Sequence, residues 1–141
     1  MDASPQLMSA TVEALLGFVL WFLVLTGWIG LYRSTLILGG RPADQFRAES
    51  TDVSAFGLRL GRARDNVFEN LPAVAALALL AIATGRTAVT DPLAMPLLYA
   101  RLAQSVTHLA STSVPAIFIR FGCYLVQIVI LVTWVIQLAA S

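Results

Sequence analysis

Long runs of apolar residues, separated by short polar segments, dominate the chain. The first run is nearly uninterrupted from Val12 to Leu31, and about 20 apolar residues are enough for a helix to cross the hydrocarbon core of a bilayer. Similar runs recur, and the pattern predicts four membrane helices at residues 10–38, 59–84, 92–112 and 115–139. We therefore expect an all-α membrane protein, a four-transmembrane-helix bundle in which residues 1–141 form a single domain.

Glycine and proline residues set the expected helix ends. Gly39 and Pro42 follow the first apolar run, and both are poor continuations of a helix. Residues 85–91 are expected to form a turn, after which Pro92 suits the first turn of the third helix, where no backbone N–H donor is needed. Pro72 lies inside the second helix, where it cannot donate to the carbonyl of Phe68 and therefore predicts a kink.

The second helix opens with a polar face. At about 100° per residue, one arc of that helix carries Arg59, Arg62, Asn66, Glu69 and Asn70. Polar residues also share one side of the third helix and of the start of the fourth, all toward the same half of the membrane. We expect one water-accessible pocket, whose excess of arginine over acid favours an anionic ligand that carries carboxylates. The predicted lining is Arg33, Arg59, Arg62, Asn66, Glu69, Arg101, Gln104, His108, Arg120 and Tyr124.

Simpler roles for the same residues stay open. Arg59 and Arg64 lie near a helix end, where long basic side chains commonly extend to the lipid headgroups. The other polar residues of the second helix also suit a polar lock between helices that holds no ligand. His108 is equally consistent with a hydrogen-bonded histidine of the bundle interior.

The composition favours the bilayer as the solvent and argues against several kinds of site. Of the 141 residues, 58% are hydrophobic and 12% are charged, so polar residues are too few to cover a soluble domain. A net charge of +1 and the lack of a basic run argue against nucleic acid as a partner. Cys123 is the one cysteine and His108 the one histidine. We therefore expect no disulfide and no metal site.

The arginines are distributed unevenly between the two expected sides of the membrane. Arg33, Arg41, Arg47 and the arginines of the second helix fall on one side, while Arg86 lies on the other. The positive-inside rule then places the first and third loops in the cytoplasm and both termini outside. The N-terminus lacks the basic region of a signal peptide, so we expect the first apolar run to be retained as a membrane helix.

Three motifs give the chain a resemblance to a known family. The motifs are Arg62-x3-Asn66-x2-Glu69-Asn70-x-Pro72, Ala100-Arg101-x6-His108-Leu109 and Ile119-Arg120-Phe121. Together they resemble the MAPEG family, the membrane-associated proteins in eicosanoid and glutathione metabolism, and in particular a bacterial-type member. The resemblance covers almost the whole chain from about Ala10, and the second-helix motif is its most specific part.

The resemblance implies a homotrimer of four-helix subunits in the bacterial inner membrane. Glutathione, the implied co-substrate, binds between neighbouring subunits at the cytoplasmic side. By position, the implied glutathione contacts are Arg33, Arg62, Asn66, Glu69, His108 and Tyr124. Arg120 is the implied catalytic residue, because family enzymes use a fourth-helix arginine to stabilise the glutathione thiolate. A hydrophobic small-molecule substrate is then expected to enter from the lipid bilayer.

Three features depart from the family pattern. Asp65 stands where several members have an arginine that contacts glutathione, and His108 replaces a third-helix tyrosine. The spacing from His108 to Arg120 is longer than in those members by about three residues, close to one helical turn.

The expected function has one main alternative. We expect a glutathione-dependent transferase or peroxidase-like protein that acts on hydrophobic electrophiles. The alternative is a non-catalytic lipid-binding or scaffold protein of the same fold, because family members without catalysis exist. A third hypothesis is a small transporter. The lack of an internal repeat argues against it.

Overall fold

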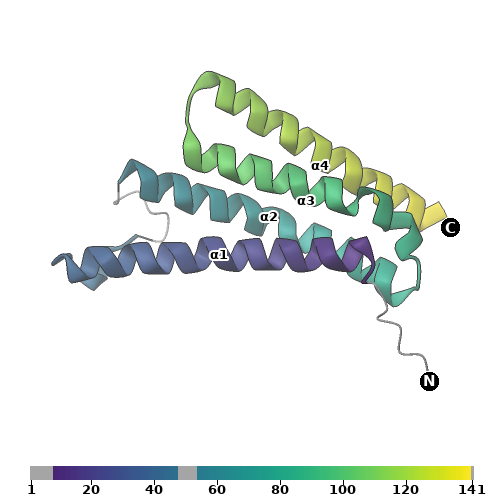
Figure 1. Cartoon of the computed structure of the whole chain (residues 1–141), viewed down its shortest axis with the longest axis horizontal. Coiled ribbons are helices and arrows are strands. Elements are labelled where there is room, and N and C mark those ends of the chain that lie inside the picture. The colour runs from purple at the N-terminus through teal and green to yellow at the C-terminus, as the bar shows by residue number, and fades with distance from the viewer. Residues whose placement is uncertain (1–7, 48–53, 141) are drawn as a thin grey trace.

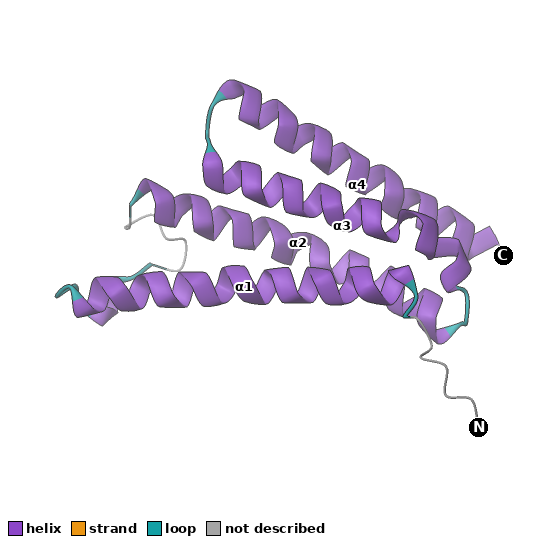
Figure 2. Ribbon diagram, viewed as in Figure 1, coloured by secondary structure: helices purple, strands orange, loops and turns teal. Residues whose placement is uncertain are grey.

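The computed structural model describes residues 8–47 and 54–140, most of which lie in four helices (Figure 1, Figure 2). The helices are α1 (Ala10–Leu38), α2 (Ala55–Ala83), α3 (Thr87–Ala110) and α4 (Val114–Ala140), with a short 3-10 helix, η1 (Ala43–Gln45), after α1. Successive helices run antiparallel (Figure 1). The α1–α2 and α3–α4 connections therefore lie at one end of the bundle, here called the loop end. The α2–α3 turn, the start of α1 and the end of α4 lie at the other, here called the terminal end.

Each of the four helices is long enough to cross a bilayer. By length and composition, α1, α2 and α4 qualify as membrane-spanning helices. α3 has 24 residues, or about 36 Å at 1.5 Å per residue, against a hydrocarbon core of about 30 Å. α3 is less apolar because it carries Arg101, Gln104 and Ser105, all of them buried against neighbouring helices. The protein is therefore an all-α membrane protein with a four-helix bundle, as the sequence predicts.

The start of α2 differs from the prediction. α2 begins at Ala55 rather than at Arg59, because Ser54 caps it. The Ser54 hydroxyl accepts a hydrogen bond from the backbone N–H of Gly57 at 3.2 Å, which satisfies one of the donors that a helix start leaves unpaired. The Tyr32 hydroxyl lies 2.6 Å from the same oxygen and ties the cap to α1.

The start of α3 also differs from the prediction. α3 begins at Thr87 rather than at Pro92, and the predicted turn over residues 85–91 is wrong. Gly85 adopts a φ of 67°, in the left-handed region that favours glycine. This residue reverses the chain within a short turn, so α3 continues through Pro92 and Pro96 instead of starting there. Pro72 lies inside α2, as expected.

Two apolar clusters form the interior. The cluster toward the terminal end contains Ala14, Phe18, Val74, Ala94, Leu97, Leu98, Ile130, Leu131 and Trp134. The cluster toward the loop end joins α1 to α2 and contains Leu25, Ile29, Leu60, Ala63 and Val67. α1 approaches α3 closely at Gly17, where an added Cβ would lie 2.6 Å from a methyl group of Leu98. Close packing of this kind stabilises helix pairs in lipid, where area burial alone gives little drive to associate.

A buried polar cluster fixes the start of α1 against the start of α3. Thr11 donates to the Asp91 carboxylate from its backbone N–H at 2.9 Å and from its hydroxyl at 2.6 Å. The hydroxyls of Thr11 and Thr90 are 2.6 Å apart, and both residues are buried. The carboxylate therefore satisfies two donors at the beginning of α1 that have little access to water.

We expect Asp91→Ala to lower the free energy of unfolding by about 1–3 kcal/mol, because two buried donors of Thr11 lose their acceptor. Thermal unfolding of the detergent-solubilised protein measures the change. Thr133→Val is the control, since the Thr133 hydroxyl donates to the Val129 carbonyl of its own helix, at 2.8 Å. Equal stability of the Asp91→Ala and Thr133→Val proteins would contradict the role assigned to Asp91.

Candidate functional site

The guanidinium of Arg101 is the most deeply buried charged group in the part of the chain that the structure describes. Arg101 lies on α3 and is 1% exposed. Its Nη1 donates to the Asn66 backbone carbonyl at 3.2 Å, to the Asn66 side-chain oxygen, and to Gln104 Oε1 at 3.0 Å. Its hydrogen-bond acceptors are thus neutral oxygens, although the carboxylate of Glu69 interacts with it electrostatically. Arg101 therefore joins α3 to α2 through amides.

The same set of amides extends to α4. Gln127 Nε2 donates to Gln104 Oε1 at 3.0 Å and to the Cys123 carbonyl at 2.8 Å. Asn66, Arg101, Gln104 and Gln127 therefore form one hydrogen-bonded layer across α2, α3 and α4, which we call the polar layer. Among the described residues, Arg101 Nε, Gln127 Oε1 and the Ser105 hydroxyl are buried without a hydrogen-bond partner.

Arg120 and His108 meet between the polar layer and the loop end. Arg120 Nη1 lies 3.0 Å from His108 Nδ1, and both residues are half-buried. A guanidinium can only donate, so Nδ1 must be the unprotonated, accepting nitrogen and the ring proton lies on Nε2. The charges of Arg62 and Arg101 also act on His108, which places three arginines around one neutral imidazole.

The polar face of α2 lies beside this pair. Arg62 and Glu69 are exposed and Asn66 is half-buried. These three side chains come from successive turns of one helix face, as their spacing predicts. We define the candidate site as Arg62, Asn66, Glu69, His108 and Arg120. It presents guanidinium donors, an amide and a carboxylate, which together suit a ligand with both carboxylates and an amine.

Arg33, one of the predicted site residues, lies apart from this group. Arg33 donates to the Arg47 carbonyl at 2.8 Å and stands over the Phe46 ring at 5.6 Å, so it contacts the segment that follows α1. Tyr124 is 38% exposed on α4. Arg33 is thus separated from the candidate site on α2–α4, and the predicted pocket with ten lining residues stays a prediction.

The Arg59 side chain contacts α3 instead of extending toward the lipid headgroups. Its Nε donates to the Leu109 carbonyl at 2.9 Å, near the end of α3. The guanidinium also stands 6.0 Å from the centre of the Phe56 ring. Arg59 thus supplies a hydrogen bond to one of the last carbonyls of α3, which have no partner within their own helix.

Asp65 pairs with a neighbouring arginine rather than with a residue of the candidate site. Its carboxylate pairs with the Arg64 guanidinium at 2.5 Å and 2.9 Å. Arg64 and Asp65, with Phe22 and Phe68, line a cavity of about 260 Å³ on the side of α2 that faces α1. The acid that replaces a family arginine is therefore neutralised by its own neighbour, Arg64.

The sequence reasoning underestimated Gln127 and the depth of Arg101. Gln127 is not among the predicted lining residues, yet it closes the polar layer on α4. Its signal was present, since Gln127 is an uncharged polar residue in the middle of an otherwise apolar run. Such residues in lipid usually find partners on neighbouring helices.

Comparison with known proteins assigns the family. A sequence model of the MAPEG family matches residues 11–140, nearly the whole chain. Neither the search of curated proteins nor that of solved structures found a match. The bundle of membrane helices described above and the polar motif of α2 agree with the family match. The chain therefore belongs to the MAPEG family, the integral membrane proteins of eicosanoid and glutathione metabolism.

Proposed function

We propose that the protein is a glutathione-dependent transferase or peroxidase-like enzyme that acts on hydrophobic electrophiles. One observation carries the proposal: Arg120 is held at 3.0 Å from His108, beside the exposed Arg62 and Glu69 of α2. Family membership supports glutathione as the co-substrate. Arg33 and Tyr124 stay predicted glutathione contacts, and His108 offers the donor Nε2–H to the same ligand.

Glutathione has groups that match the candidate site. It carries two carboxylates, an ammonium and a thiol. Arg62 suits a carboxylate through its forked donors, and Glu69 suits the ammonium. Asn66 is tied by its backbone and side-chain oxygens to Arg101, so α2 presents this face in a fixed register. Binding through these groups leaves the thiol to reach toward α4.

Arg120 supplies the chemistry in this proposal. A free thiol has a pKa of about 8.5, so only a small part is thiolate at neutral pH. A guanidinium beside the sulfur favours the anion, which is the nucleophile. The sulfur then forms a bond to the electrophilic carbon, the leaving group departs with its electron pair, and the thiol proton passes to water. An electrophile dissolved in the bilayer reaches α4 from its exposed apolar side.

We also propose the predicted homotrimer. Phe22 lies near the middle of α1, and the Arg64–Asp65 pair lies beside it. The two side chains are 31% and 48% exposed, although a charged group in the middle of a bilayer costs about 2.5–3.5 kcal/mol on insertion scales. A neighbouring subunit that covers this pair removes it from lipid.

Native mass spectrometry of the detergent-solubilised protein is expected to show three copies of the chain. Arg64→Ala leaves Asp65 without its ion-pair partner and is expected to lower the trimer fraction. A single copy in the wild-type spectrum would rule out the assembly.

The loop end is proposed to face the cytoplasm of a bacterial cell, with both termini outside. Arg86 alone among the nine arginines belongs to the terminal end, in the pattern that the positive-inside rule describes. The candidate site then opens toward the compartment that keeps thiols reduced. A reporter enzyme fused to the C-terminus and active in the cytoplasm would reverse this orientation.

Arg120→Ala is expected to lower the turnover of a standard aromatic electrophile by about 100-fold or more, as for the loss of one preorganised donor to a developing anion. Glutathione binding, measured by calorimetry, is expected to persist. Arg62→Ala is expected to weaken that binding instead, and Arg41→Ala, in the segment after α1, is the charge-matched control. Glutathione binding by the wild type without any turnover would favour the non-catalytic alternative.

His108→Phe is expected to lower kcat/KM about tenfold or more, because Arg120 loses the acceptor that orients it. His108→Asn keeps an oxygen near the position of Nδ1 and is expected to retain most of the activity. The double variant with Arg120→Ala tests the mechanism, since residues that act as one unit have non-additive effects. Fully additive losses would mean that His108 acts independently of Arg120.

A further inference from the structure

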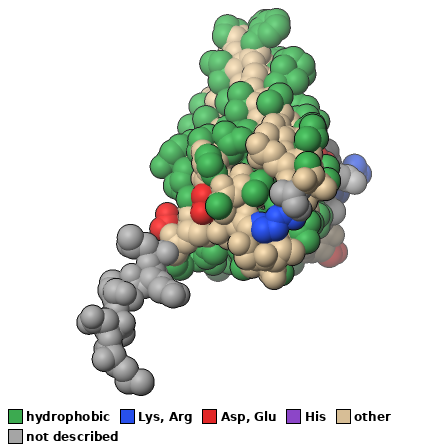
Figure 3. All heavy atoms as spheres, turned by 90° about the vertical axis from the view of Figure 1, so that its right-hand side faces the viewer, with side chains coloured by type: hydrophobic (Ala, Val, Ile, Leu, Met, Phe, Trp, Pro, Cys, Tyr) green, Lys and Arg blue, Asp and Glu red, His purple; other side chains and the backbone are tan. Residues whose placement is uncertain are grey.

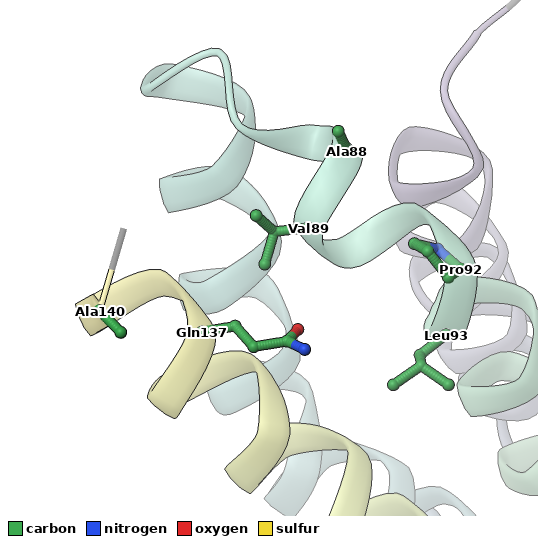
Figure 4. A pocket seen from close by; sticks show the side chains of 6 residues that line it. All are labelled: Ala88, Val89, Pro92, Leu93, Gln137 and Ala140. Atoms are coloured by element: carbon green, nitrogen blue, oxygen red, sulfur yellow. The ribbon is translucent and has the colours of Figure 1, made fainter.

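A groove lies at the terminal end, between the first turns of α3 and the last turns of α4 (Figure 4). Its volume is about 430 Å³, within the range of about 300–1,000 Å³ that is typical of small-molecule sites. The lining is Ala88, Val89, Pro92, Leu93, Gln137 and Ala140. The groove is at the opposite end of the bundle from the candidate site, so glutathione chemistry does not explain it.

The lining explains both the shape and the character of the groove. Ala88 and Ala140 have short side chains, which leaves open space where the two helices face each other (Figure 4). Pro92 and Leu93 form an apolar wall on α3. Gln137 extends from α4 toward that wall and is the one polar residue of the lining (Figure 4). A mainly apolar groove on the outside of a membrane bundle suits a hydrocarbon chain.

A cation lies next to this groove. Arg86, in the turn between α2 and α3, donates from Nη2 to the backbone carbonyl of Gln137 at 3.2 Å. Its guanidinium therefore reaches from the turn to α4. Among the described residues it has no carboxylate partner, because the carboxylate of Asp91 is engaged by Thr11. The terminal end shows few charged side chains among hydrophobic ones (Figure 3).

We propose that this groove binds one acyl chain of an anionic phospholipid whose phosphate is held by Arg86. The guanidinium lies at the end of the membrane helices, where headgroups are found, and its forked donors suit a phosphate. An anionic headgroup supplies the counter-charge that Arg86 lacks within the described chain. A zwitterionic headgroup brings its own ammonium close to the guanidinium, so it is a poorer match.

Native mass spectrometry with added lipid tests the site. The purified protein is mixed in detergent with equal amounts of phosphatidylglycerol and phosphatidylcholine of the same acyl chains. We expect preferential retention of phosphatidylglycerol. Arg86→Gln is expected to lower that preference about fivefold, the factor that corresponds to about 1 kcal/mol per basic residue at an anionic membrane surface. Val89→Trp fills the groove and is expected to reduce retention of both lipids.

Matched variants separate this site from general charge effects. Arg41→Gln removes the same charge at the loop end and is expected to keep the phosphatidylglycerol preference. An unchanged preference in Arg86→Gln, or an equal loss in Arg41→Gln, would overturn the proposal. A change in the number of chains caused by Val89→Trp would also overturn it, because the groove would then be a subunit interface. Size-exclusion profiles that match the wild type establish that each variant is folded.

Discussion

The guanidinium of Arg101 is buried among three helices of a chain whose solvent is lipid. A buried charge is tolerated only when hydrogen bonds replace its hydration. Asn66 and Gln104 supply these bonds, and Gln127 continues them to α4. Because the acceptors come from fixed positions, α2, α3 and α4 have to meet in one register. That register brings the exposed Arg62 and Glu69 of α2 to the same side of the bundle as the Arg120–His108 pair.

The two ends of the bundle have different chemistry. At the loop end, arginines are numerous and bind histidine, backbone carbonyls and aromatic rings. At the terminal end, Thr11, Thr90 and Asp91 form a small polar cluster, and Arg86 lies beside an apolar groove, hydrogen-bonded to the Gln137 carbonyl. Between the two ends, the buried interior is apolar except for the polar layer and Ser105. A thiol peptide and a lipid chain therefore suit opposite ends of the same subunit.

Periodicity and hydropathy predicted the helices because a bilayer demands long apolar runs. The first helix was predicted over the range observed, whereas α3 was misjudged because Pro92 resembled a start signal and the left-handed turn at Gly85 was not recognised. The polar face of α2 was predictable from the spacing of Arg62, Asn66 and Glu69 alone. The Asn66–Arg101 bond was not, because it depends on the relative height of two helices. The orientation of Asp65 likewise depends on a neighbouring side chain, Arg64.

α3 differs from the other helices in a way that bears on membrane insertion. Its neighbours are apolar enough to enter a bilayer on their own, but α3 carries an arginine and two other polar residues that the folded bundle buries. An arginine at the centre of an isolated helix opposes insertion. α3 therefore depends on partner helices as it enters the membrane, because the oxygens that surround Arg101 come in part from α2. Because Arg101 donates to Asn66 of α2, the residue that fixes the finished bundle also links the insertion of α3 to the helix that precedes it.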